Sequence, residues 1–221
     1  MFPLVLVGLA FAAVVLVARA ADAAPGLRIV RCPLPALRDQ GAPLAPPTGI
    51  VFPVTSVDPR VRDIAYVDTT GAVHNNDRTG VSADRYFGAP RDGGARHHAG
   101  IDLVAHAGDG IYAMESGVVV GMATGYVGLD AIVIAHASGV VALYGELRVA
   151  SGLKAGDGVS FGQRIGTATT SSAGTELHIE LWEHGHAPTS FTAWPAGSPA
   201  PKGLLDPTAY LFELAQSSLE A

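Results

Sequence analysis

Residues 130–147 read DAIVIAHASGVVALYGEL, and this stretch decides the fold class. Two apolar runs, 132–136 and 140–144, flank Ala137-Ser138-Gly139, which is the pattern of a β-hairpin. Outward from this hairpin, further β-branched runs separated by glycine turns occur at 63–71, 110–125, 158–168 and 175–185. Short runs with turn residues between them predict an all-β domain built on an antiparallel sheet or sandwich.

The segments around these runs set the predicted domain limits. Residues 24–62 are proline-rich and poorly periodic, which predicts a mostly irregular lead-in. The domain is expected over residues 63–215, with its core at 85–211 and a tail at 216–221. A short C-terminal helix is predicted to begin at Asp206-Pro207, because Asp is a good N-cap and proline suits the first helical position.

The composition excludes several classes of protein. The 221 residues include 20 acidic and 14 basic side chains, for a formal net charge of −6 and without a Lys/Arg cluster. A nucleic-acid binder needs a basic face, so that class is excluded. The 27 glycines and 15 prolines disfavour a helical bundle. Cys32 is the single cysteine, so neither an internal disulfide nor a cysteine-rich zinc site is expected.

The N-terminal residues predict export. Residues 2–18 carry no charged side chain, and two small-x-small sites follow at Ala18-Arg19-Ala20 and Ala21-Asp22-Ala23. This pattern predicts a signal peptide over residues 1–23, with cleavage after Ala20 or Ala23 into the periplasm or the extracellular space. The alternative is a retained anchor, since the apolar run sits at the short limit of a membrane span. Membrane contact is expected only through this segment, if it is uncleaved.

Two short motifs carry metal-ligating residues. His98 and Asp102 lie four residues apart, and Glu176 and His178 lie two apart. Even spacing on an extended strand places both side chains of each pair on one face. Two histidines and one carboxylate from such segments form an open zinc site that leaves a fourth position for water. The same ligand set also occurs in non-haem iron sites, although no other part of the chain resembles an oxygenase.

The order of motifs resembles a known family. From Phe87 to Leu211 the chain is similar to the lysostaphin/LytM-type zinc metallopeptidases, which cut peptides of bacterial peptidoglycan. The matching motifs are His98-Ala-Gly-Ile-Asp102, GDGIYAMESGVV at 108–119, Tyr144-Gly-Glu-Leu147, GDGVSFGQRIG at 156–166 and SAGTELHIE at 172–180.

The resemblance implies roles for individual residues. It implies that His98, Asp102 and His178 bind Zn²⁺. It also implies that two helper histidines of the family are replaced here by Glu146 and Glu176.

Three neighbouring residues are interpreted from the same pattern. Tyr144 keeps the family's tyrosine and is predicted to line the groove and bind substrate, with a core position as the alternative. His136 is interpreted as structural, and Glu180 as an ordinary strand-face carboxylate.

The two glutamates determine the functional hypotheses. A carboxylate accepts a proton but donates to an oxyanion only when it is itself protonated. We therefore predict Glu176 as the general base and Glu146 as the residue that carries a shared proton.

The first functional hypothesis is an exported zinc metalloendopeptidase that acts on peptidoglycan peptides, with water at the open zinc position as the nucleophile. The alternative is a catalytically silent zinc-binding module that binds peptidoglycan or regulates another cell-wall hydrolase. A structural domain with a vestigial site is the third hypothesis.

Overall fold

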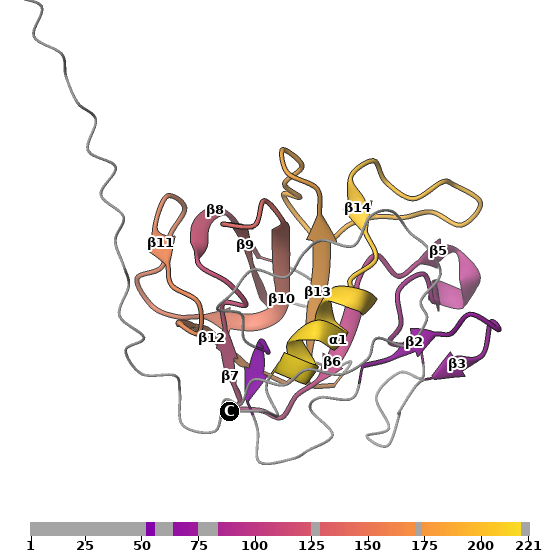
Figure 1. Ribbon diagram of the computed structural model, residues 1–221, viewed down its shortest axis with the longest axis horizontal. Helices are drawn as coiled ribbons and strands as arrows, with labels where there is room; N and C mark the ends of the chain where they lie inside the picture. Colours follow the sequence, from indigo (N-terminus) through magenta and orange to yellow (C-terminus); the bar gives the residue numbers. More distant parts are fainter. Residues whose placement is uncertain (1–51, 56–63, 75–83, 125–128, 171–173, 218–221) are drawn as a thin grey trace, which may run out of the picture.

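A computed structural model describes residues 52–55, 64–74, 84–124, 129–170 and 174–217 (Figure 1). The main sheet consists of β1 (Val54–Thr55), β6 (Ile101–Val104), β7 (Gly110–Tyr112), β8 (Gly117–Thr124), β9 (Asp130–His136), β10 (Val141–Val149), β11 (Gly158–Val159), β12 (Arg164–Ala168), β13 (Glu176–Trp182) and β14 (Leu204–Leu205). Two small hairpins and a helix complete the described part: β2 (Tyr66–Val67) with β3 (Val73–His74), β4 (Pro90–Arg91) with β5 (Arg96–His97), and α1 (Thr208–Ser217).

The architecture confirms the all-β prediction, because the described strands pair antiparallel and only one short α-helix accompanies them. The predicted hairpin is β9–β10. The backbone N–H of His136 donates to the carbonyl of Val140 at 2.8 Å, and Gly139 closes the turn with a φ of 93°, a region that favours glycine.

Strand β10 organises the sheet. One of its edges pairs with β9 along most of its length, whereas the other edge pairs first with β13 and then with β12. The pairing with β13 ends at Gly145, and the pairing with β12 begins at Leu147. Glu146 lies at this change of partner, in a β-bulge and with a φ of 63°. Bulges of this kind redirect a side chain and are common next to functional sites.

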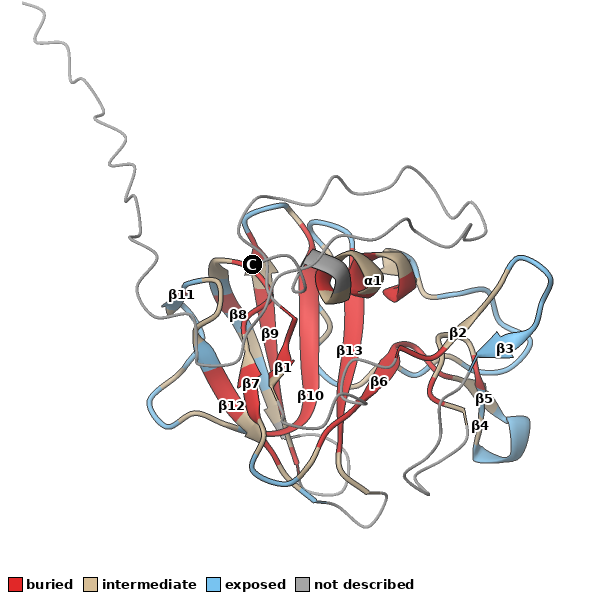
Figure 2. Cartoon of the chain, turned by 60° about the horizontal axis from the view of Figure 1, so that its bottom comes forward, coloured by how far each residue is buried: buried red, intermediate tan, exposed pale blue. Residues whose placement is uncertain are grey.

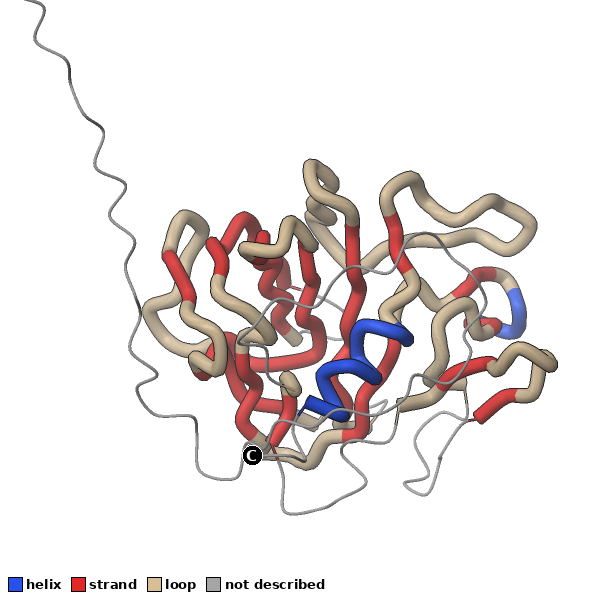
Figure 3. The backbone as a smooth tube through the Cα atoms, in the orientation of Figure 1, coloured by secondary structure: helices blue, strands red, loops and turns tan. Residues whose placement is uncertain are grey.

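The two faces of the sheet are covered differently. Helix α1 lies across one face (Figure 3), where Tyr210, Leu211 and Leu214 join the larger hydrophobic core. Alternate residues of β13 belong to that core, and the residues between them point to the opposite face. A smaller apolar cluster around Trp182 covers part of that second face. Strands β10 and β13 are therefore largely buried (Figure 2), with α1 on one side and the predicted metal ligands on the other.

The proline-rich lead-in is not irregular throughout. Phe52 and Val54 are buried, and β1 pairs with β7, so residues 52–55 extend the domain beyond its predicted start at residue 63. An end strand tolerates the neighbouring Pro53, because no further strand needs its missing N–H.

At the other end of the chain, the predicted helix is present. The Asp206 carboxylate accepts a hydrogen bond from the backbone N–H of Thr208 at 2.9 Å, as expected of an N-cap. None of the helices in the described ranges is long and apolar enough to cross a membrane. The predicted signal peptide and most of the lead-in lie outside the described residues.

Candidate functional site

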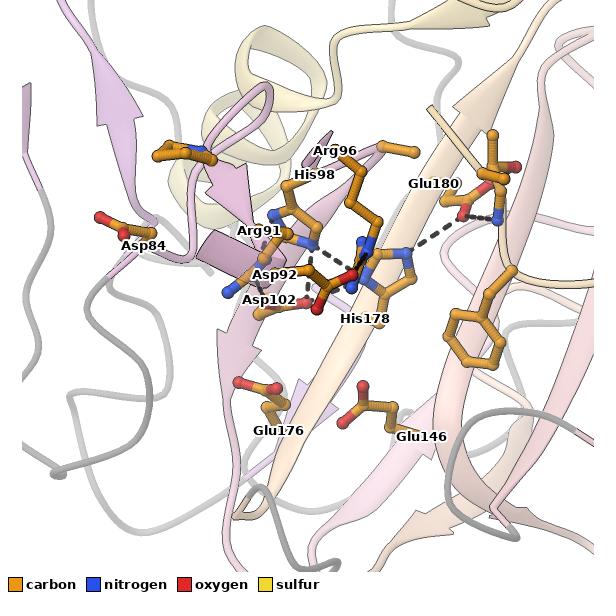
Figure 4. Close-up of a pocket in the computed structure, with 15 residues that line it drawn as sticks. Asp84, Arg91, Asp92, Arg96, His98, Asp102, Glu146, Glu176, His178 and Glu180 are labelled. Carbon is orange, nitrogen blue, oxygen red and sulfur yellow. Dashed lines mark hydrogen bonds and ion pairs between the residues drawn. The ribbon is translucent and has the colours of Figure 1, made fainter. Parts of the chain in front are cut away.

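A groove with a volume of about 590 Å³ lies on the sheet face opposite α1 (Figure 4). Its floor holds the sequence-predicted ligands and both glutamates: His98, Asp102, Glu146, Glu176 and His178. One wall is the β4–β5 hairpin, and the other wall is the segment 191–193. The groove therefore brings together all the predicted metal and catalytic residues, although their roles stay predictions.

The β6–β13 pairing positions the metal-ligating residues. Asp102 and His178 are direct cross-strand partners, and His98 precedes β6. Gly100 makes the close approach feasible, because a Cβ at this position would lie 2.3 Å from the carbonyl oxygen of Ile179 and 2.8 Å from Cε1 of His178. A glycine in the His98–Asp102 motif is therefore a packing requirement of the site.

The three ligand atoms converge closely. Nε2 of His98 lies 3.1 Å from Nδ1 of His178 and 3.1 Å from Oδ1 of Asp102. Nδ1 of His178 lies 2.8 Å from the same carboxylate oxygen. Ligands of a tetrahedral zinc ion stand roughly 3.3 Å apart, so this triangle needs to expand by only a few tenths of an ångström to hold the ion.

The outer partners of both imidazoles fix their tautomers. Nδ1 of His98 lies 3.0 Å from the carbonyl oxygen of Tyr86, which only accepts, and 3.2 Å from Nη2 of Arg91, which only donates. The shorter contact, to Tyr86, favours a proton on Nδ1, which leaves Nε2 with a free lone pair. Nε2 of His178 lies 3.2 Å from the Glu180 carboxylate, so Nε2 donates and Nδ1 faces the triangle. Two lone pairs and a carboxylate oxygen that point at one another need a cation between them. The residues present therefore fit a zinc ion.

Without a metal, bound protons stabilise the three converging ligand atoms. Burial lowers the pKa of His178, but hydrogen bonds to Asp102 and Glu180 outweigh burial and raise that pKa to about 10. Burial lowers the pKa of His98. Burial opposes ionisation of Asp102, yet the two histidines hold the pKa of its carboxyl group well below its usual value. The triangle is thus an anionic oxygen with two imidazoles that a cation or a proton stabilises.

Glu180 is a site residue that the sequence interpretation missed. Its fully buried carboxylate accepts hydrogen bonds from His178, from Nε1 of Trp182 at 3.0 Å and from the N–H of Thr192 at 2.9 Å. A carboxylate behind a metal-ligating histidine orients the ring and raises its basicity. The spacing held the information, because Glu180 lies two residues after His178 and shares its strand face.

Arg91 is the second residue that was missed. Its guanidinium forms an ion pair with Oδ2 of Asp102, the oxygen that does not face the histidines. Nη2 also lies 3.2 Å from Nδ1 of His98. Arg91 therefore holds Asp102 so that only Oδ1 points into the triangle. Little in the sequence indicated this contact, since Arg91 lies on a separate hairpin eleven residues before Asp102.

The two glutamates form a buried acid pair. Both side chains point toward the triangle from below in Figure 4, and the negative charge of Glu146 contributes to the raised pKa of Glu176. Oε2 of Glu176 has no hydrogen-bond partner within the described ranges. Burial, together with the negative charge of Asp102, raises the pKa of Glu146 to about 7 and that of Glu176 to about 9. In the metal-free protein the pair therefore holds at least one proton at neutral pH.

The two groove walls are joined to each other. The N–H of His97 donates to the carbonyl of Trp194 at 2.7 Å, and the N–H of Ala196 donates to the carbonyl of Ala95 at 2.9 Å. Arg96 and Pro195 form a β-bridge at the same place. The β4–β5 hairpin and the 191–196 segment therefore form one continuous wall around this side of the groove.

A comparison with family models matches residues 96–189 to Peptidase family M23. Residues 96–189 therefore resemble peptidase family M23, and the match indicates a domain of the peptidase kind. The match agrees with a groove in which His98, Asp102 and His178 could hold a metal ion. A comparison with curated proteins found no match.

Solved structures resemble this domain at low sequence identity. The catalytic domain of the antimicrobial peptidase lysostaphin from Staphylococcus simulans is 22% identical, with a TM-score of 0.41, over 58% of this chain and 87% of that chain. A mutant catalytic domain of the prophage-encoded M23 protein EnpA from Enterococcus faecalis is 26% identical, with a TM-score of 0.41, over 62% and 95%. Helicobacter pylori Csd3 is 21% identical, with a TM-score of 0.40, over 74% and 39%.

The position of Tyr144 differs from one expectation about this groove. The predicted substrate contact is wrong, because Tyr144 has no exposed surface and its hydroxyl lies 2.9 Å from both Nε2 of His136 and the N–H of Met114. Residues on β10 alternate between the two faces, so Tyr144 points into the core beneath α1 while Gly145 faces the groove. His136 has the structural position that the sequence analysis assigned to it.

Proposed function

We propose that this chain is an exported zinc metallopeptidase that hydrolyses peptide bonds of bacterial peptidoglycan. The match of residues 96–189 to Peptidase family M23 supports the peptidase activity. Export rests on the N-terminal sequence pattern, and peptidoglycan as substrate rests on the motifs between Phe87 and Leu211.

One observation carries the metal part of the proposal. His98, Asp102 and His178 present three ligand atoms within 3.1 Å of one another, and outer hydrogen bonds orient both imidazoles toward the centre. When bound there, a divalent metal supplies Lewis acidity that polarises a scissile carbonyl and acidifies water. A positive ion in the triangle also favours the ionised forms of nearby carboxyl groups, and so lowers the raised pKa values of the acid pair.

The acid pair handles the protons of the reaction. Oε2 of Glu176, which lacks a partner in the described part of the chain, accepts the proton that water loses as it attacks the peptide carbonyl. In this proposal Glu146 holds the one proton that the pair retains and donates it toward the oxygen on which charge develops, although in the metal-free protein Glu176 has the higher pKa. The leaving amine then takes the proton from Glu176. Arg91 and Glu180 act through Asp102 and His178, which they hold in position.

The catalytically silent module remains the second candidate function. One observation favours it, because both groups beside the triangle are carboxyl groups, which accept protons more readily than they donate them. In this alternative the zinc-loaded groove binds peptidoglycan peptide, or a second cell-wall hydrolase, without cleaving it.

The deciding experiment measures metal content and hydrolysis together. We expect the purified full chain to bind about one zinc ion and, when loaded, to release new amino groups from purified peptidoglycan. Treatment with a chelator should abolish the release, and added zinc should restore it. Zinc binding without hydrolysis would favour the silent module, and failure to bind zinc would refute both forms of the proposal.

A further inference from the structure

The two arginines that line the groove are engaged differently. Arg91 forms an ion pair with Asp102. Arg96 donates only through Nε, to the carboxylate of Asp92. Within the described residues, its two terminal nitrogens have no hydrogen-bond partner. Arg96 therefore offers the groove a pair of parallel N–H donors, the arrangement that best matches a carboxylate.

The backbone holds Arg96 in a defined place. Arg96 pairs with Arg91 across the β4–β5 hairpin on one side and forms the bridge to Pro195 on the other. Asp92, its side-chain partner, begins the connecting turn with a φ of 52°, a conformation that non-glycine residues seldom adopt. A surface arginine without a role needs no such support, because an exposed ion pair contributes little stability.

The surroundings of Arg96 determine which carboxylate fits. Next to Arg96, the hydrogen bonds of His97 and Ala196 join the hairpin to the 194–196 segment, so a peptide chain cannot continue through the wall at this point. A peptide that lies over the triangle and ends at this wall brings its terminal group to Arg96. Of the two terminal groups of a peptide, the carboxylate pairs with a guanidinium and the ammonium does not.

We propose that Arg96 is an anion subsite for the C-terminal carboxylate of the bound peptide, which makes the groove selective for peptide ends. This inference rests on the proposed function and deepens it. The reaction adds water across the last peptide bond: the hydroxyl group remains on the carbonyl carbon, the C–N bond breaks, and the terminal residue leaves as an amine with its own carboxylate held by Arg96.

The test uses one peptide in three forms. The probe is an N-acetylated pentapeptide that ends in D-Ala-D-Ala, prepared as the free acid, as the C-terminal amide, and as the acid extended by three glycines. Affinity is measured by calorimetry on the full chain, both zinc-loaded and zinc-depleted. We expect the free acid to bind about 10- to 100-fold more tightly than the other two forms, the usual effect of a hydrogen-bonded charged group.

Variants assign that preference to Arg96. Arg96→Gln should lower the affinity for the acid to that for the amide and leave the amide unchanged, whereas Arg96→Lys should retain part of the preference. Arg148→Gln removes an exposed arginine of β10 and should change nothing. Equal affinities in the unsubstituted protein, a preference that survives Arg96→Gln, or equal binding of the extended acid would overturn the inference.

Binding to the zinc-depleted protein separates this inference from the proposed function. An Arg96-dependent preference without hydrolysis supports the anion subsite and refutes the peptidase. Hydrolysis by the zinc-loaded protein without such a preference supports the peptidase and refutes the anion subsite.

Discussion

The two halves of the groove floor are built in opposite ways. In the metal half, each imidazole has a hydrogen-bond partner for its outer nitrogen, and Asp102 has a guanidinium on its outer oxygen. In the glutamate half, two carboxyl groups are buried, and the negative charge of Glu146 contributes to the raised pKa of Glu176. One oxygen of Glu176 has no partner in the described part of the chain, and Glu146 has a left-handed backbone conformation.

This difference separates binding from chemistry. A satisfied outer layer fixes ligands and favours a tightly held metal. Buried acids with shifted pKa values and strained backbone are costly for stability and persist where function requires them. Under the proposed function, the metal half therefore holds the ion, and the glutamate half determines whether a bound peptide is cut.

The largest expected effect breaks the metal half. Asp102→Asn keeps the shape of the side chain but removes its charge, so zinc affinity should fall by more than about 100-fold, beyond the 10- to 100-fold cost of losing an outer partner. Competition with a chelator of known affinity measures the change. Glu146→Gln, in the other half, should alter zinc affinity by less than about tenfold. A zinc affinity of Asp102→Asn equal to that of the unsubstituted protein would place the metal elsewhere.

The second effect breaks the glutamate half alone. Glu176→Gln removes the proposed base and should lower hydrolysis by about 10²-fold or more, with zinc retained. Glu146→Gln keeps a donor at its position and should cost less. A larger loss for Glu146→Gln would reverse the two roles.

Restoring histidines sharpens the same comparison. Glu176→His should be tolerated or improve activity. If the unsubstituted chain binds zinc but cuts no peptidoglycan, and the double variant Glu146→His with Glu176→His gains activity, the silent module is correct.

The same division describes how far the sequence could predict the molecule. Even spacing placed Glu176 and His178 on one strand face, and the family resemblance selected His98 and Asp102 as their partners. The hairpin at 130–147 and the Asp206 cap follow from local residue preferences, so the fold class and the C-terminal helix were predictable.

Contacts between distant segments were not predictable in this way. Arg91 reaches Asp102 from a separate hairpin, and residues 52–55 pair with β7 across more than fifty positions. Tyr144 was expected at the groove because it keeps the family's tyrosine, and the alternative, a core position, is the one observed. The bulge at Glu146, which separates the face of Glu146 from that of Tyr144, has no local sequence pattern.

A smaller effect tests the outer layer of the metal half. Arg91→Ala and Glu180→Gln should each lower zinc affinity by about 10- to 100-fold, because each leaves a metal ligand without its orienting partner. Added guanidinium ion should restore affinity to Arg91→Ala but not to Glu180→Gln. Arg148→Gln, an exposed arginine outside the groove, is the matched control. If Arg91→Ala and the control bind zinc equally well, Arg91 has no positioning role.

The last prediction is a pH dependence that only the metal-free protein should show. Burial raises the pKa of Glu146 from 4.5 to about 7 and that of Glu176 from 4.5 to about 9. Between pH 4.5 and each raised pKa, the glutamate concerned binds more protons in the folded state than in the unfolded state. This contribution to stability is complete below pH 4.5 and is lost as the pH rises through about 7 and then about 9. His178, with its pKa raised from 6.5 to about 10, adds a loss of the same sign above pH 6.5.

The free energy of unfolding of the chelator-treated protein should therefore decrease from pH 7 to pH 9, by up to about 1.4 kcal/mol per pH unit for each extra proton. Denaturant titrations at several pH values measure this slope. The glutamine of Glu176→Gln does not titrate. The free energy of unfolding of this variant should therefore decrease less steeply with pH, by the amount that one proton contributes. Zinc displaces the proton of His178 and favours ionised glutamates, so the loaded protein should be nearly independent of pH over this range. Stability of the metal-free protein that stays level or rises from pH 7 to pH 9 would mean that the glutamate half is ionised in the folded state, and the contrast between the two halves would then lose its electrostatic basis.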